Sequence, residues 1–184
     1  MKKFNNRMTK EERRKQILES ALKVFTEKGY NGSTTIDIAK EAVISEVTLF
    51  RYFDSKKQIF MEAIEPILLT SLKESLAGSE DLEPVSKLEY ILRNRIKYIS
   101  QYNDVIKLVL MESQVNPEVA DFDLIKQTTS ILKDSIKDTG VELEDEDFLI
   151  RIMMGSILSF LYLPKITDDE IDLYVEHLVA KIIK

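Results

Sequence analysis

The chain of 184 residues contains no cysteine, no tryptophan and a single histidine. The absence of cysteine excludes disulfides and thiolate-bound zinc. One histidine leaves no histidine pair, and the sequence also lacks a glycine-rich phosphate loop and a nucleophile elbow. We therefore expect no enzyme, no metal and no cofactor. A hydrolase that uses only carboxylates stays open as an alternative, without any motif in its favour.

Glycine and proline are scarce, with five and four residues, and most of them fall between segments of helical periodicity. No stretch alternates apolar and polar residues between hairpin turns, as β-strands would. The apolar fraction of 44% is ample for a hydrophobic core. The sequence therefore predicts an all-α protein, with a three-helix domain over residues 1–55 and a second helical domain over residues 56–184.

Hydrophobic runs long enough to cross a membrane are also missing. The longest, residues 148–163, has 16 residues and is interrupted by Arg151, whereas a spanning helix needs about 20. Met1 is followed by lysines and polar residues rather than by the apolar region of a signal peptide. We therefore expect a cytoplasmic protein with no membrane partner.

The net charge is −6, so the chain as a whole has no excess of positive charge. The charge is, however, unevenly distributed along the sequence. Residues 1–60 hold 13 lysines and arginines against 8 acids, whereas residues 61–184 hold 13 against 24. A basic front and an acidic remainder indicate that the N-terminal part is the one that meets nucleic-acid phosphates.

The most informative stretch is residues 33–60, which predict two short helices joined by a tight turn. The first helix runs over about 35–42 and the second over about 45–53, with Ser45 as its N-cap. A further helix begins after Ser55, where Ser55 and Gln58 fit a capping box. Two short helices at a steep angle are the geometry that places the second one in the DNA major groove.

The second short helix supplies the candidates for base contacts. If Leu49 and Phe53 turn inward, its exposed side chains are Glu46, Val47, Thr48, Phe50 and Arg51. Val47 suits the methyl group of thymine, and Arg51 suits either guanine O6 and N7 or a phosphate.

These motifs, taken in order from Arg13 to Ile64, resemble the tetracycline-repressor (TetR) family of bacterial regulators. The resemblance is carried by Val24-Phe25-Thr26-Glu27-Lys28-Gly29-Tyr30, Thr34-Thr35, Ile38-Ala39, Ser45, Thr48 to Phe53, and Ser55-Lys56. It implies phosphate contacts from Thr35, Thr48, Phe50, Tyr52 and Lys56, with Thr34 in the same DNA-facing set.

The chain departs from the family pattern at three positions. Val43 stands in the turn where the family usually has glycine, and a β-branched residue tolerates a positive φ poorly, so we expect a different turn. Val47 replaces a small residue. Phe50 replaces a tyrosine and lacks the hydroxyl that would bond a phosphate.

The last two helical segments predict a two-fold interface that forms one half of a four-helix bundle. The segment 148–163 is apolar nearly all round, and the final segment carries an apolar stripe. In the family, the last two helices make the homodimer. The candidate interface residues are Ile152, Gly155, Ser156, Ser159, Tyr174, Leu178 and Ile182, and we expect His177 at the rim or on the surface.

The resemblance implies a small-molecule effector among the helices of residues 84–163. The aromatic and flexible side chains there suit a flat, apolar or cationic ligand, although each of them also suits an ordinary core position. The candidates are Tyr90, Tyr98, Tyr102, Met111, Phe122, Met153 and Phe160.

The sequence thus predicts a sequence-specific transcriptional regulator, a homodimeric repressor that an effector releases from a palindromic operator on double-stranded DNA. Pro66, inside a helical pattern that begins at Ser55, predicts a kink where the two domains bend relative to each other. The alternative is an architectural DNA-binding protein without an effector, which would have little sequence preference.

Overall fold

The computed structural model describes residues 8–67, 78–116, 119, 124–139, 146–163 and 166–182. The regular structure in these ranges is helical throughout, which confirms the all-α prediction. The helices are α1 (Lys10–Gly32), α2 (Thr35–Glu41), α3 (Glu46–Leu49), α4 (Lys56–Glu65), α6 (Pro84–Gln101), α7 (Asn103–Val115), α8 (Leu124–Thr139), α9 (Glu146–Tyr162) and α10 (Asp168–Ile182). Within the described ranges, no helix is long and apolar enough to cross a membrane.

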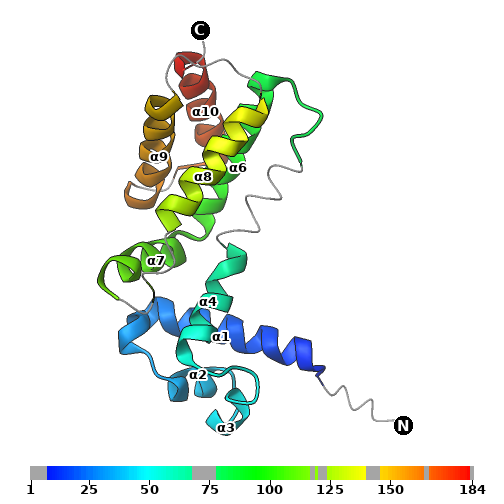
Figure 1. The fold of residues 1–184 in the computed structure, drawn as a ribbon, viewed down its shortest axis with the longest axis vertical. Helices are drawn as coiled ribbons and strands as arrows, with labels where there is room; N and C mark the ends of the chain where they lie inside the picture. The colour runs from blue at the N-terminus through cyan, green and yellow to red at the C-terminus, as the bar shows by residue number, and fades with distance from the viewer. Residues whose placement is uncertain are drawn as a thin grey trace.

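The N-terminal helices α1 to α4 lie at one end of the elongated molecule, and α6, α8, α9 and α10 form a bundle at the other (Figure 1). Helix α7 lies between the two groups and packs against α1. Helices α2 and α3 lie at the end of the molecule opposite the bundle, and this end carries the expected DNA-facing segment.

Helix α1 begins with a capping box formed by Thr9 and Glu12. Thr9 accepts a hydrogen bond from the Glu12 N–H, and the Glu12 carboxylate accepts one from the Thr9 N–H at 2.7 Å. The helix is broken at Gly29, whose φ is 72° and ψ 170°, and a final turn continues to Gly32. Glycine adopts this left-handed φ without steric cost, which explains why the break occurs there.

An aromatic cluster forms the core between α1 and α4. Phe25, Tyr30 and Phe60 are buried, and the Phe60 ring meets each of the other two edge-on at a centroid distance of 5.0 Å. Such edge-to-face contacts add to the hydrophobic gain of burying large rings. Because Phe60 lies on α4, the cluster fixes α4 across the long helix α1.

Helix α4 continues through Pro66, where residues 66 and 67 take π-helical geometry. A proline removes one backbone donor from the helix, and a local π turn accommodates that loss. Regular α-helix thus ends at Glu65, with Pro66 as the C-cap, and the bend between domains at Pro66 stays a prediction.

The C-terminal bundle is organised around α6, which packs against α8, α9 and α10. Lys97 on α6 pairs with Asp168 at 3.2 Å and with Asp172 at 3.3 Å, and Arg93 pairs with Asp172 at 2.8 Å. Asn103, at the start of α7, donates to the Leu161 carbonyl near the end of α9 at 3.1 Å. These polar contacts set how the helices are placed around the apolar core.

Candidate nucleic-acid interface

Helix α2 begins with a capping box that the sequence pattern did not single out. Thr34 accepts a hydrogen bond from the Asp37 N–H at 3.1 Å, and Asp37 accepts one from the Thr34 N–H at 3.1 Å. Lys28 bonds the Asp37 carboxylate at 2.8 Å. Hydrogen bonds from Lys28 and then Thr34 lower the pKa of Asp37 to about 2. The start of α2 is therefore held to the end of α1 by an ionised carboxylate.

The turn between α2 and α3 corrects our expectation at Val43. Its φ is 54°, so the valine takes the left-handed conformation that the family's glycine would take, although the sequence predicted a different turn. The Ile44 N–H donates to the Ala39 carbonyl at 2.9 Å across this turn. Val43 is 84% exposed, so the side chain gains no packing in return for the backbone strain.

Helix α3 is shorter than the predicted 45–53. It begins at the expected N-cap, where Ser45 Oγ accepts from the Thr48 N–H at 3.2 Å, and it ends at Leu49. The next residues tighten into turns, because the Arg51 N–H donates to Thr48 and the Tyr52 N–H donates to Leu49, three residues back. The prediction that Leu49 and Phe53 face the core is confirmed, since they are 0% and 1% exposed.

The predicted DNA-contacting residues surround this short helix in two groups. The exposed ones are Thr34, Val47, Phe50 and Arg51. The half-buried ones are Thr35, Glu46, Thr48, Tyr52 and Lys56. Thr35 donates its hydroxyl to the Glu46 carboxylate, which ties the start of α2 to the start of α3. The hydroxyl groups of Ser45 and Thr48 lie 2.8 Å apart.

Lys56 has contacts within the protein that the sequence pattern did not indicate. Its Nζ donates to the Tyr30 carbonyl at 2.8 Å and to the Ser33 carbonyl at 3.1 Å. The same ammonium lies 4.2 Å from the centre of the Tyr30 ring, within cation–π range. Lys56 therefore fixes the start of α4 to the end of α1, beside the DNA-facing segment.

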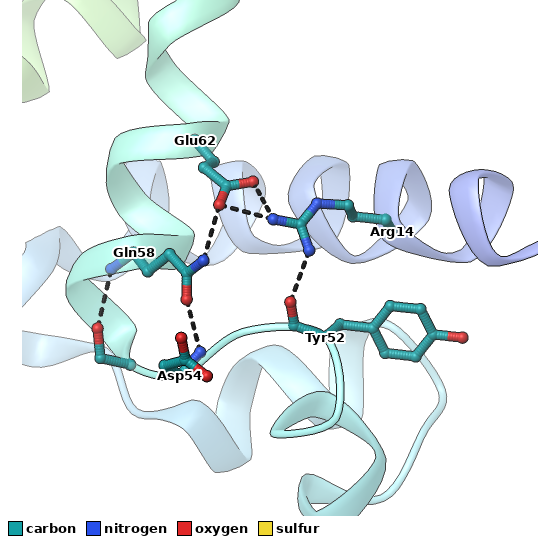
Figure 2. Close-up of polar contacts among 6 residues, drawn as sticks. Arg14, Tyr52, Asp54, Gln58 and Glu62 are labelled. Carbon is teal, nitrogen blue, oxygen red and sulfur yellow. Dashed lines mark hydrogen bonds and ion pairs between the residues drawn. The ribbon is translucent and has the colours of Figure 1, made fainter.

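Figure 2 shows a second set of contacts that holds the segment after α3. Arg14, on α1, donates to the Tyr52 carbonyl at 2.6 Å and also binds the Glu62 carboxylate. Gln58 donates to Glu62 at 3.0 Å and accepts from the Asp54 N–H at 2.6 Å. The guanidinium of Arg14 also lies 4.2 Å from the centre of the Phe53 ring. Periodicity places Arg14 on a helix but carries no signal for these distant partners.

The predicted effector residues have different surroundings in the described structure. Met111 is 66% exposed on α7, and Met153 is fully buried in the core. The roles of Met111 and Met153 in an effector pocket stay predictions. Phe160 packs against Tyr174, with ring centres 5.1 Å apart. Tyr90 lies against Gly78. Phe122 lies outside the described residues.

Tyr98 and Tyr102 do come together, with ring centres 4.5 Å apart. Tyr102 also lines an open groove of about 330 Å³ between α1 and the corner where α6 meets α7. The lining residues are Glu19, Leu22, Lys23, Thr26, Gln101, Tyr102, Asp104 and Val105. Among the described residues, no group of three or more acids and histidines is arranged to hold a metal ion.

The predicted interface residues lie on α9 and α10, and those described are exposed or half-buried. Gly155 is exposed, and a Cβ added there would meet nothing within 4 Å. Large apolar side chains near it are exposed as well: Phe148 by 61%, Tyr162 by 67% and Leu173 by 53%. Half-buried predicted residues complete the face: Ile152, Ser156, Ser159, Tyr174 and Leu178. The side chain of Ile182 lies outside the described residues, and His177 is exposed.

The N-terminal part of the chain matches a known protein family. Residues 17–63 match the model of bacterial regulatory proteins of the tetR family. The chain is 26% identical over 147 residues to the biofilm operon icaADBC HTH-type negative transcriptional regulator IcaR of Staphylococcus epidermidis, which covers 76% of this chain and 77% of that protein. IcaR of Staphylococcus aureus is 42% identical over 50 residues, 27% of each chain.

Solved structures share the fold beyond the matched segment. A Clostridium perfringens chain described as a fatty acid metabolism regulator superposes with a TM-score of 0.73 at 27% identity, covering 92% of this chain and 99% of its own. The structure of AibR in complex with isovaleryl coenzyme A and operator DNA superposes with a TM-score of 0.71 at 18% identity, covering 93% and 98%.

Proposed function

Since the chain is a TetR-family transcriptional regulator with a DNA-binding helix-turn-helix, we propose that it is a homodimeric repressor that releases a palindromic operator when a small molecule binds its C-terminal domain. The observation that carries this proposal is the short helix α3, which lies at the far end of the molecule with Leu49 buried, Val47 exposed, and an exposed Arg51 just after it. Such a helix suits insertion into a major groove.

The exposed residues divide the DNA contacts between bases and backbone. Val47, in the first turn of α3, offers an apolar surface to a thymine methyl group. Arg51, just after α3, reaches guanine or a phosphate. Thr34, Thr35, Thr48 and Tyr52 supply hydroxyl donors to phosphates, whereas Phe50 offers only apolar contact. Lys56 adds positive charge behind this surface while it stays bonded to Tyr30.

We propose that the outer face of α9 and α10 forms the dimer. Phe148, Tyr162 and Leu173 are more than half exposed, an unfavourable arrangement for large apolar side chains unless a partner covers them. Gly155 leaves open space at the centre of this face, where a second helix can approach closely. Two copies related by a two-fold axis would then present two α3 helices to half-sites about one helical turn apart.

The proposal of repression draws on IcaR, which is named as a negative regulator. The proposal of an effector draws on AibR, which was crystallised with both isovaleryl coenzyme A and operator DNA. For this chain, we propose an apolar or cationic organic molecule. The paired rings of Tyr98 and Tyr102 suit the face of such a ligand.

Selection from a random duplex DNA library at near-physiological salt tests the proposal. Enrichment of a palindrome with two half-sites is the expected result. Weak binding that disappears with salt and enriches no sequence would instead mean an architectural DNA-binding protein, because phosphate contacts alone do not discriminate sequences. Screening small molecules for release of the selected palindrome then tests the effector.

A further inference from the structure

The carboxylate of Glu112, on α7, is buried against the end of α1. Glu112 is 9% exposed, and its Oε1 accepts a 2.8 Å hydrogen bond from the Tyr30 N–H. One turn further along α7, Asn116 donates to the side-chain oxygen of Asn31 at 3.2 Å. Figure 1 shows α7 at this position, between the bundle and the N-terminal helices. A helix of the C-terminal part thus holds the last turn of α1.

Gly29 makes this close contact possible. Its φ is +72°, and Glu112 Oε1 lies 3.2 Å from the position that a Cβ at Gly29 would occupy. A side chain at this position would therefore meet both backbone strain and the carboxylate. The break in α1 and the buried acid of α7 are two parts of one arrangement.

Tyr30 is held from its other side by the DNA-binding domain. Its carbonyl accepts the hydrogen bond from Lys56, whose ammonium also lies over the Tyr30 ring. Lys56 opens α4 and follows closely on the segment that carries Phe50 and Arg51. Through its backbone N–H and carbonyl, Tyr30 therefore connects Glu112 on α7 to Lys56 at the start of α4, beside the DNA-facing segment.

The hydrogen bond from the Tyr30 N–H to Glu112 positions Tyr30, but its net contribution to stability is modest. Glu112 Oε2 is buried and has no hydrogen-bond partner among the described residues. A buried carboxylate with one unpaired oxygen keeps much of its desolvation cost, which offsets the gain from its single charged hydrogen bond. Moving α7 away from α1 would break this hydrogen bond.

We propose that Glu112 is the positioning residue through which the C-terminal helices fix the placement of each helix-turn-helix. With Glu112 bonded to Tyr30, both DNA-binding domains of the dimer are held at the spacing of the two half-sites. When α7 moves, the domains lose that spacing while each stays folded. This inference rests on the proposed function as an operator-binding dimer.

Distance measurements test the positioning role without DNA. The chain has no cysteine, so spin labels attach only at introduced cysteines, here Lys40→Cys on α2 and Ser130→Cys on α8, both exposed positions. Dilution with unlabelled protein leaves one labelled chain per dimer. Glu112→Ala is expected to broaden the distance distribution between the labels. Glu112→Gln keeps an acceptor for the Tyr30 N–H and is expected to preserve the wild-type width.

The matched control is Gln114→Ala, an exposed residue of the same helix. Its distribution is expected to equal that of the wild type. If Glu112→Ala does not fold, Glu112→Asp keeps the charge but shortens the side chain, and it is expected to broaden the distribution in the same way. An unchanged width in a folded Ala or Asp variant would overturn the proposal.

Binding to two duplexes separates positioning from local damage. Glu112→Ala is expected to bind the full palindrome at least tenfold more weakly, roughly the effect of one charged hydrogen bond, and to bind a single half-site within twofold of the wild type. Equal losses on both duplexes, or no loss on either, would overturn the proposal. A wild-type protein that binds no palindrome contradicts the proposed function instead, and the distance measurement still decides the role of Glu112.

Discussion

Arg14 and Glu62 are joined across 48 positions of sequence, because Nη2 of the guanidinium bonds both oxygens of the carboxylate (Figure 2). Nη1 of the same arginine bonds the Tyr52 carbonyl. The side chains of Arg14 and Glu62 are 28% and 30% exposed, so water screens the pair only partly. One side chain therefore connects α1, α4 and the turn that follows α3.

Arg14→Ala is expected to lower the free energy of unfolding by about 2 kcal/mol, because it removes a partly buried ion pair and a bond to a backbone carbonyl. Arg14→Lys should recover little of this loss, since the single ammonium of lysine cannot replace the two guanidinium nitrogens that bond Tyr52 and Glu62. Denaturant titration measures both variants. Lys15→Ala, which removes an exposed neighbour, should change stability by no more than a few tenths of a kcal/mol; an equal loss in this control would contradict the role of Arg14.

Val43→Gly is expected to stabilise the protein by about 0.5–1 kcal/mol. Glycine relieves the left-handed strain at φ 54°, and its greater freedom in the unfolded chain offsets part of that gain. Lys15→Gly, at an exposed position in the interior of α1, should instead destabilise the protein by about 1 kcal/mol, because glycine is unfavourable inside a helix. Melting temperatures of the two variants should therefore move in opposite directions.

Glu46→Gln is expected to tighten binding to duplex DNA of any sequence by roughly threefold to tenfold at low salt, because it removes a negative charge near the phosphates. Glutamine can still accept the Thr35 hydroxyl, so the local structure is kept. Fluorescence anisotropy with specific and random duplexes measures the effect. Glu176→Gln, an equal charge change on α10, should leave affinity unaltered. A gain confined to one sequence would instead show that Glu46 reads a base.

Asp37 gives the N-terminal domain a defined pH dependence. Its folded-state pKa of about 2 lies below the ordinary value of 3.8, so its stabilising contribution is present above that value and is lost as the pH falls toward 2. The wild type and Asp37→Asn should therefore differ in unfolding free energy by a constant amount above about pH 5, and the difference should shrink toward pH 2. A difference that stays constant down to pH 2 would refute this assignment.

Gly155→Glu is expected to leave the chain folded and to prevent dimer formation. A side chain at this position meets open space within one chain, whereas the proposed interface brings a second helix to the same place. Sedimentation reports the assembly and circular dichroism the helical content. Ser130→Glu, an exposed position on α8, should remain dimeric. A dimeric Gly155→Glu protein would place the interface elsewhere.

Local patterns in the sequence predicted much of the DNA-binding domain. The N-cap at Ser55 was predicted from residues three apart, and the inward placement of Leu49 and Phe53 follows from helical spacing. The second half of the predicted capping box does not form, because the Gln58 side chain accepts from the Asp54 N–H and not from Ser55. The resemblance to the family rests on this same segment. The shorter α3 was missed because its last residues keep helical spacing while their hydrogen bonds tighten to three-residue turns.

Long-range contacts could not be predicted from one sequence. Arg14 and Glu112 lie on helices whose local patterns give no sign of partners 48 and 82 positions away. The exposure of Met111 could not be predicted for a related reason, because an apolar residue at a helical position can face the core or the solvent. Which face is covered depends on the packing of the other helices.

The bond between Tyr30 and Glu112 offers a spectroscopic reporter for finding effectors. A backbone N–H that donates to a carboxylate has an unusual proton chemical shift in an NMR spectrum. The chemical shift of the Tyr30 N–H would move toward ordinary values when α7 moves away. A molecule that displaces α7 would therefore shift the Tyr30 amide signal even if it binds far from it. A library of compounds can be ranked by this one signal before any operator is known.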